Sequence, residues 1–195
     1  MFFPAGEKAS SVAVGQNHTA ILTSSGKILV CGSDAAMQLG RRDTVWSWTR
    51  KEEDKAPVFH ATPAPLDLPP DLLGKPFLSI SAGKNFTAAI VKLEDERGRQ
   101  GVVTFGEGLD GQLGHKNPQH VGRVRLVSAL AGRKEWDEPS GETRSLHPVQ
   151  VACGASHVVA LMSNGATLAW GANREMQLGD GGRAGCRTPG LVMAL

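Results

Sequence analysis

The sequence predicts an all-β protein, a partial β-propeller of about three blades that form an open arc. Three observations support this fold class. A pattern of glycines recurs three times in register, short apolar runs end at those glycines, and 24 of the 195 residues are glycine. So many glycines are typical of tight turns between short strands rather than of long helices.

Three glycine positions define each copy of the repeat, and the last of them closes a Gln-Leu-Gly triplet. In chain order they are Gly15, Gly32 and Gly40, then Gly83, Gly106 and Gly114, then Gly154, Gly171 and Gly179. The second and third positions are 8 residues apart in every copy. A fixed spacing indicates stacked units that bury their apolar faces against one another. We therefore predict one repeat domain over residues 1–195, with repeats near 12–40, 80–114 and 151–179 and insertions near 41–79, 92–101 and 115–148.

The first copy predicts three short strands joined by turns. The apolar residues 12–14 end at Gly15, residues 18–23 form the second strand, and residues 28–31 form the third. Ser24 to Lys27 is the turn between the last two, because it combines small polar residues with a glycine. The connecting stretches would supply a fourth strand to each blade, and the sequence does not say where.

The second and third copies repeat this pattern. Asn164–Gly165 supplies the positive φ that a tight hairpin needs in the third copy. In the second copy the same hairpin has a longer, charged loop from Lys92 to Gln100, which accounts for six extra residues. That loop is either a solvated tip or a partner contact. We expect hairpins near residues 12–31, 80–105 and 151–170.

These residues resemble the repeats of the regulator-of-chromosome-condensation family, the RCC1-type repeats. The family pattern is an apolar strand, Gly-x-x-His, a second strand, a glycine turn, a strand ending in Trp-Gly, and Gly-Gln-Leu-Gly. The third copy matches it best, with Gly154, His157, Trp170 and Gly171 in place, and the first copy keeps Gly15 and His18. The resemblance implies a propeller fold and loops that bind other proteins.

The copies depart from the family pattern at three places. Phe86 replaces the histidine of the second copy, and Cys31 and Phe105 replace the tryptophan of the first and second. Met37 and Met176 stand where the family has the first glycine of Gly-Gln-Leu-Gly, which only the second copy keeps at Gly111. Because methionine reaches positive φ only at a cost, we expect those two turns to differ from the turn at Gly111.

The insertions carry the candidate partner-binding residues. The first insertion places two tryptophans beside mixed charge, and Trp and Arg are favoured anchors in protein interfaces. We predict a contact surface there, with local packing of the rings on a blade edge as the alternative; its residues are Trp46, Trp48, Arg50 and Lys51. The second insertion mixes Arg133, Lys134 and Trp136 with acidic residues, which indicates an ordinary solvated surface or a weaker phosphate site.

No catalytic, metal-binding or cofactor motif accompanies the repeat. The sequence lacks a phosphate-binding loop, a nucleophile elbow and the HExxH pattern, and its three cysteines are not spaced as a zinc site. His18 and His157 could suggest a site, but Phe86 at the equivalent position indicates structural packing. Gly106 to Gly111 matches GxGxxG by letters only, since no helix pattern follows it. We expect no enzyme activity of its own and no cofactor.

The favoured function is a non-catalytic protein–protein interaction platform, a subunit or fragment of a larger assembly. The alternative is guanine-nucleotide exchange on a small GTPase, which the family resemblance implies for its founding member and its partner Ran. A net charge of +2 and the lack of a basic tail argue against nucleic acid as a partner, and no apolar run approaches the roughly 18–20 residues that span a membrane. We expect a cytoplasmic, cytoskeletal or nuclear location.

The two ends of the chain predict an incomplete ring. Family propellers usually have more blades than the three copies supply. The stretch from Thr188 to Leu195 resembles the segment from His147 to Gln150 that leads into the third copy, so we expect it to announce a further repeat. Open terminal blades would expose edge strands, which another chain or self-association would cover.

Overall fold

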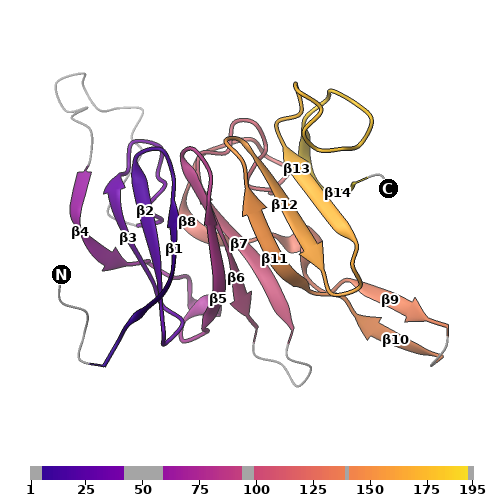
Figure 1. The fold of residues 1–195 in the computed structure, drawn as a ribbon, viewed down its shortest axis with the longest axis horizontal. Coiled ribbons are helices and arrows are strands. Elements are labelled where there is room, and N and C mark those ends of the chain that lie inside the picture. The colour runs from indigo at the N-terminus through magenta and orange to yellow at the C-terminus, as the bar shows by residue number, and fades with distance from the viewer. Residues whose placement is uncertain (1–5, 42–58, 94–98, 139–140, 193–195) are drawn as a thin grey trace.

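The computed structural model describes residues 6–41, 59–93, 99–138 and 141–192. These residues form three four-stranded antiparallel sheets, and each sheet takes its strands in chain order. No α-helix occurs within the described ranges. The three sheets follow one another along the molecule as propeller blades, and they leave an open arc (Figure 1).

The strands of each blade agree with the hairpins expected from the sequence and extend them slightly. Blade one consists of β1 (Ala9–Val14), β2 (His18–Thr23), β3 (Ile28–Ser33) and β4 (Phe59–Pro65). Blade two consists of β5 (Phe77–Ala82), β6 (Phe86–Lys92), β7 (Gln100–Gly106) and β8 (Val121–Leu126). Blade three consists of β11 (Pro148–Cys153), β12 (His157–Met162), β13 (Thr167–Gly171) and β14 (Cys186–Leu191).

The connecting segments supply the fourth strands. β4 and β8 lie in segments that the sequence indicated as insertions, and each pairs antiparallel with the third strand of its blade. Two short 3₁₀ turns, η2 (Pro70–Leu72) and η3 (Ser128–Leu130), then lead toward the next blade. Each contributes a buried leucine to the core, so these segments are part of the blades.

The C-terminal stretch was expected to lead into a further repeat, but residues 188–191 belong to blade three. Thr188, Pro189 and Gly190 lie in β14, where Gly190 pairs with Ala169 of β13. They are therefore the outer strand of blade three. The segment they were compared with, from His147 to Gln150, enters β11, an innermost strand. Proline is tolerated in both because each is at the edge of its sheet.

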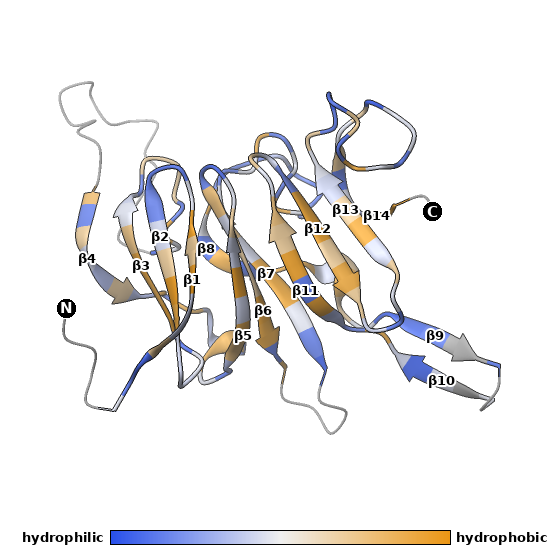
Figure 2. Ribbon diagram, in the orientation of Figure 1, coloured by the Kyte–Doolittle hydropathy of each residue, from blue (hydrophilic) through white to orange (hydrophobic). Residues whose placement is uncertain are grey.

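The hydrophobic core consists of two clusters, one at each contact between blades. The central strands of the blades are largely apolar along their length, and β6 and β7 are buried on both faces (Figure 2). The first cluster lies between blades one and two and includes Leu39 and Phe105; the second lies between blades two and three and includes Phe86 and Trp170. Each blade is thus stabilised by its neighbour, as expected for a repeat protein.

A short β-hairpin between blades two and three is an addition to the repeat. It consists of β9 (Lys134–Asp137) and β10 (Glu142–Ser145), which pair only with each other. The hairpin projects away from the blades at one end of the arc (Figure 1). The sequence analysis did not predict it, because its mixed charges resemble an ordinary loop.

The glutamine of each Gln-Leu-Gly triplet closes its own turn. Its side-chain oxygen accepts a hydrogen bond from the backbone N–H two residues earlier, at 2.7 Å for Gln38, 2.9 Å for Gln112 and 2.9 Å for Gln177. The residue before each glutamine has positive φ in all three copies: 61° at Met37, 81° at Gly111 and 59° at Met176. The expectation that the methionine turns differ is therefore wrong. The glutamine bond enforces one turn geometry, and the methionines adopt it.

Replacing Met176 by glycine should stabilise the protein. Relief of the left-handed conformation at a residue with a Cβ should add roughly 1–2 kcal/mol to the free energy of unfolding. The larger entropy of an unfolded glycine should subtract roughly 0.5–1 kcal/mol from it. Met176 is 49% exposed, so little packing is lost. We expect the free energy of unfolding in urea to rise by about 0.5–1 kcal/mol. The exposed neighbour Glu175, whose φ is not positive, is the control, and Glu175→Gly should destabilise. Equal losses from both variants would contradict the assignment of strain to Met176.

Candidate functional site: the blade joints and the surfaces they leave open

The ring of His18 forms a polar contact between blades one and two. It packs so closely over Gly15 that a Cβ on that glycine would lie 2.1 Å from a ring carbon. His18 is 3% exposed, and its Nε2 lies 2.9 Å from the hydroxyl Oγ1 of Thr87 on β6. Either atom can donate this hydrogen bond, depending on the tautomer of the ring. The Gly-x-x-His motif therefore positions a ring at the boundary between two blades.

The equivalent contact between blades two and three is apolar. Phe86 packs over Gly83 as His18 packs over Gly15. Val158 of blade three occupies the position of Thr87, immediately after the ring residue of its own copy, and both Phe86 and Val158 are completely buried. Histidine is thus matched with threonine and phenylalanine with valine. The threonine gives Nε2 of His18 a partner, which would cost about 1–3 kcal/mol to lose, while Nδ1 of the ring stays buried without one among the described residues. The Phe86–Val158 pairing brings no polar side-chain atom into the joint.

A series of backbone hydrogen bonds joins the blades at the turn after each first strand. The N–H of Gln16 donates to the carbonyl of Lys84 at 2.9 Å, and the N–H of Lys84 donates to the carbonyl of Ala155 at 3.1 Å. The three residues are equivalent, since each follows the first glycine of its copy. Both the N–H and the carbonyl of Lys84 in the middle blade are therefore hydrogen-bonded, one to each neighbouring blade.

The aromatic residue that ends the third strand completes the joint. Trp170 is fully buried, and its indole N–H donates to the backbone carbonyl of Gln112 in the preceding blade at 2.8 Å. Phe105 occupies the same place against the turn of blade one, where a Cβ on Gly40 would lie 2.9 Å from the ring. The last glycine of the first two triplets, Gly40 and Gly114, thus makes room for the aromatic ring of the next blade.

Blade one exposes a face whose equivalents in blades two and three are covered by the preceding blade. Val12 and Val14 of β1 are 65% and 69% exposed. The residues equivalent to Val12 are Ile80, which is half-buried, and Val151, which is 7% exposed. They are covered because β5 and β11 pack against the preceding blade. The face around Val12 and Val14, which we call the leading face, is therefore half of a blade joint.

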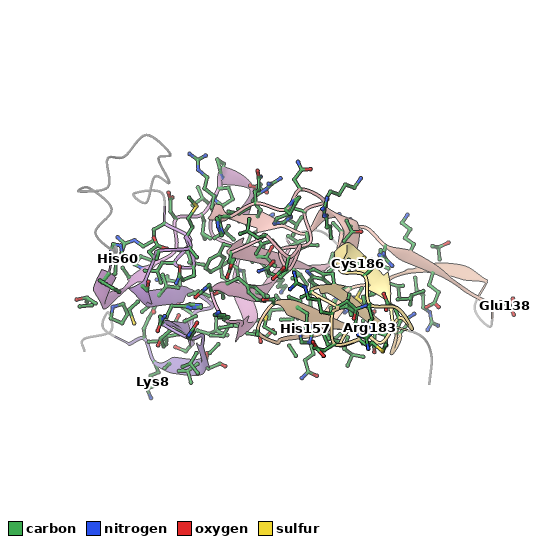
Figure 3. The ribbon with its side chains drawn as sticks, turned by 90° about the horizontal axis from the view of Figure 1, so that it is seen from above. Lys8, His60, Glu138, His157, Arg183 and Cys186 are labelled. Carbon is green, nitrogen blue, oxygen red and sulfur yellow. The ribbon has the colours of Figure 1, made fainter. Side chains whose placement is uncertain are left out.

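Blade three exposes the opposite half. His157, Val159 and Leu161 of β12 are only partly buried, whereas the equivalent residues of blades one and two are buried against the next blade. Burial still lowers the pKa of His157. We call the surface around His157, Val159 and Leu161 the trailing face. Figure 3 shows His157 on the same side as Arg183, in the loop before β14, and Cys186, the first residue of β14.

The β9–β10 hairpin is a third surface. Lys134, Thr143 and Arg144 are exposed on it. Its base is held by the backbone bond from Leu146 to Arg133 and by the Asn164 side-chain amide, which donates to the Glu135 carboxylate at 3.0 Å. The projection of the hairpin tip near Glu138 is seen in Figure 3. An isolated two-stranded ribbon leaves backbone groups unpaired along its edges, and such edges can bind an extended peptide.

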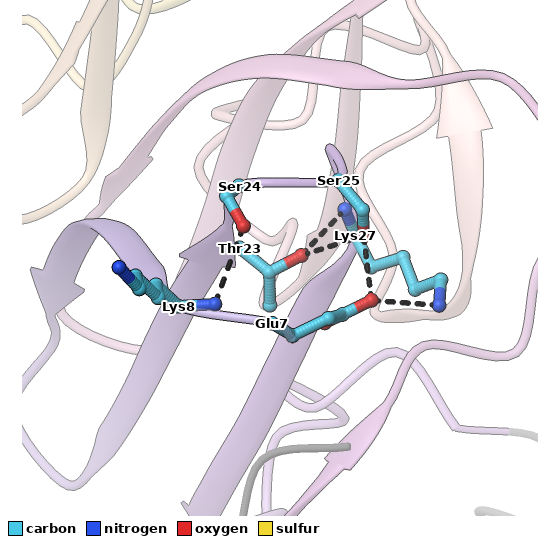
Figure 4. Close-up of polar contacts among 6 residues, drawn as sticks. All are labelled: Glu7, Lys8, Thr23, Ser24, Ser25 and Lys27. Atoms are coloured by element: carbon cyan, nitrogen blue, oxygen red, sulfur yellow. Dashed lines mark hydrogen bonds and ion pairs between the residues drawn. The ribbon is translucent and has the colours of Figure 1, made fainter. Parts of the chain in front are cut away.

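A polar cluster fastens the start of β1 to the β2–β3 turn (Figure 4). The Glu7 carboxylate accepts hydrogen bonds from the Ser25 hydroxyl at 2.6 Å and from the Lys27 ammonium at 2.8 Å. These bonds, to Lys27 first and then Ser25, lower the pKa of Glu7. Ser24 adds a bond to the backbone of Lys8 at 3.2 Å. The Lys27 side chain is 63% exposed, so its ion pair with Glu7 orients the strand and contributes little stability.

The described residues contain no group of three or more His, Cys, Asp or Glu side chains that could hold a metal ion. Cys31, Cys153 and Cys186 are free and half-buried. Burial raises the pKa of the Cys153 thiol to about 12, so it is neutral and poorly nucleophilic. His115 hydrogen-bonds Thr104 inside blade two. No helix in the described part of the chain is long and apolar enough to cross a membrane.

The sequence-predicted site residues fall into two groups. The repeat positions lie at the blade joints and turns described above. Trp46, Trp48, Arg50 and Lys51 lie outside the described residues, so their role in partner binding stays a prediction. Sequence reasoning missed Thr87 and Val158 as joint partners. A signal was present in the sequence. Both residues follow the ring position of their own copy, and each is polar or apolar as the ring residue of the preceding copy is.

Comparison with known proteins gives one family. A model of the regulator of chromosome condensation (RCC1) repeat matches residues 9–36 and 149–177. The human E3 ubiquitin-protein ligase HERC2 is 31% identical over 86% of this chain and 3% of its own length. The probable E3 ubiquitin-protein ligase HERC4 of Mus musculus is 31% identical over 93% of this chain and 14% of its own. The chain thus spans a small part of these relatives.

Solved structures show the same fold at lower identity. Human WBSCR16 has a TM-score of 0.70 and 21% identity, with 97% of this chain and 41% of that chain covered. Prp20p of Saccharomyces cerevisiae has a TM-score of 0.66 and 21% identity, with 95% of this chain and 38% of that chain covered. At this identity the likeness concerns the fold alone.

Acidification should weaken the joint between blades one and two. Burial lowers the pKa of His18 from 6.5 to about 4, so the unfolded chain binds a proton at His18 that the folded chain does not between these pH values. Stability from this group is present above pH 6.5 and is lost as the pH falls toward 4, by up to about 3 kcal/mol.

Urea unfolding at several pH values measures this effect. His18→Phe should reduce the pH dependence between pH 7 and pH 4.5, although it lowers stability at neutral pH. His115, whose pKa burial and Arg125 also lower to about 4, will leave a residual dependence in both proteins. Identical pH dependence in the two proteins would contradict a buried neutral His18.

Proposed function

Because the chain carries repeats of the RCC1 family, we propose that it is a non-catalytic platform that binds other proteins as part of a larger assembly. The observation that supports this proposal most directly is the β9–β10 hairpin. It projects beyond the blades and carries charged residues of both signs, and no other sheet covers its edges within the described residues. We place such a platform in the cytoplasm, the cytoskeleton or the nucleus, a location that the sequence allows.

The geometry of the hairpin favours a partner with an extended segment, and its charges are of both signs, since Glu135 and Glu138 accompany the two cations. Lys134 and Arg144 are exposed and belong to opposite strands, with Lys134 paired to Ser145 and Arg144 paired to Glu135. An incoming strand could add main-chain hydrogen bonds to either edge, while Lys134 and Arg144, which lie on opposite faces of the hairpin, could each contribute a charged contact.

Charge reversal on the hairpin tests this function. Lys134→Glu combined with Arg144→Glu should reduce capture of the assembly partner about tenfold or more, with the circular dichroism spectrum unchanged. The matched control is Lys92→Glu with Arg123→Glu, which reverses two exposed cations on blade two. Capture from source lysate is followed by mass spectrometry, and the identified partner is then titrated as a purified protein. Equal loss in the control, or no loss in either variant, would contradict a role of the hairpin.

The tryptophan-bearing segment supplies a second, independent prediction. If Trp46 and Trp48 are interface anchors, Trp46→Ala with Trp48→Ala should lower affinity for the same purified partner by about tenfold to a hundredfold, because anchor truncations cost about 2 kcal/mol or more. Thermal unfolding is the control for local packing. Unchanged affinity in a folded variant would restrict the contact to other surfaces.

Guanine-nucleotide exchange on a small GTPase is the second candidate function. It is favoured by the fold likeness to Prp20p, which was crystallised in a study of its binding to Gsp1p and histones. Release of a fluorescent guanine nucleotide from a panel of small GTPases distinguishes the two. Accelerated release that the hairpin variant abolishes would favour exchange, and no release with stable partner capture would favour the platform.

A further inference from the structure

The leading and trailing faces are the two halves of one kind of contact. Blade two packs on blade one, and blade three packs on blade two, through the same elements. The trailing face belongs to the strand of blade three that corresponds to β2 and β6. The leading face belongs to β1, which corresponds to β5 and β11. Both halves are therefore continuous with an interface that the chain already forms twice.

Contact between the two faces would bring the ring residue of the trailing face opposite a residue of matching polarity on the leading face. His157 is the ring residue of the trailing face, and its counterpart His18 is paired with a threonine. The residue of blade one at the position of Thr87 is Thr19. Histidine would thus face threonine again, as in the first joint, and not valine, as in the second. Thr19 is only half-buried and makes no side-chain hydrogen bond within the described residues.

The backbone hydrogen bonds between equivalent turn residues, Gln16, Lys84 and Ala155, would also continue across this contact. Lys84 donates to the next blade and accepts from the previous one. The N–H of Ala155 and the carbonyl of Gln16 have no such backbone partner in the part of the chain that the structure describes. If the trailing face met the leading face, the carbonyl of Gln16 would accept from Ala155, since the donor always lies in the preceding blade.

The apolar surfaces are complementary as well. Val12 and Val14 would cover Val159 and Leu161, as the first strand of each following blade covers the second strand of the blade before it. Contact would remove the apolar area of these exposed valines from water, so the two residues provide a substantial driving force for contact.

We propose that this chain associates head to tail with a second copy, so that the trailing face of one copy packs on the leading face of the other with His157 hydrogen-bonded to Thr19. Such a contact is heterologous, so it either closes into a ring or propagates. Two copies would supply six blades, within the roughly 4–8 blades that closed propellers use. The proposal deepens the platform function and rests on it, because it names a second copy as one component of the assembly.

A reciprocal pair of substitutions tests the contact. Sedimentation equilibrium of the 195-residue chain from about 1 to 100 μM measures its dissociation constant. His157→Phe alone and Thr19→Val alone should each weaken association about tenfold or more, because each leaves a polar group buried opposite an apolar one. The double variant copies the Phe86–Val158 pair and should recover to within about threefold of the wild type.

Two single variants separate this contact from other kinds of association. Val14→Asp on the leading face should abolish association. Val149→Asp is the matched control, because Val149 is 45% exposed and its equivalent in blade two, Leu78, stays 44% exposed within a joint. Circular dichroism and thermal unfolding establish that every variant is folded.

A monomer at 100 μM would overturn the proposal. So would association that Val14→Asp leaves intact, or a double variant no better than the single ones. The hairpin variant distinguishes this failure from failure of the platform function. Lys134→Glu with Arg144→Glu should retain head-to-tail association while it loses the other partner.

Discussion

The structure depends on one constraint, which is that the core clusters form between neighbouring blades and not within a single blade. A four-stranded sheet presents an apolar surface on both faces, and in this chain each inner surface is buried against the neighbouring blade. The joint is therefore the unit of stability, as in repeat proteins generally. The repeated glycines are placed where neighbouring parts approach each other closely. Gly15 and Gly83 lie beneath a ring of the same turn, and Gly40 and Gly114 lie beneath the aromatic residue of the next blade.

The sequence predicted the fold class and the first three strands of each blade because those elements carry local signals. Short apolar runs, turn glycines and a fixed spacing depend only on nearby residues. A fourth strand was expected from each connecting stretch, but β4, β8 and β14 could not be placed, because they are proline- or arginine-bearing edge strands without an alternating pattern. The turns at Met37 and Met176 were misjudged because a local preference was overridden by the hydrogen bond of the following glutamine.

The candidate surfaces were predicted less well than the fold, for a physical reason. Whether Val12 is core or surface depends on whether a blade precedes it, and its own sequence context is the same as that of the buried Val151. The β9–β10 hairpin is held by few contacts outside itself, so its residues carry no core signal. Joints and exposed surfaces in this protein thus contain the same residue types. Only the arrangement of the blades determines which of these residues are buried.

The central claim is that each joint is a matched pair, formed by the ring residue of one blade and the residue after the ring position in the next. A double-mutant cycle on the described joint between blades one and two tests it most directly. The free energy of unfolding would be measured for the wild type, His18→Phe, Thr87→Val and the double variant. We predict a loss of about 1–3 kcal/mol for each single variant and near-recovery in the double variant, because it reproduces the Phe86–Val158 joint. Additive losses would contradict the account.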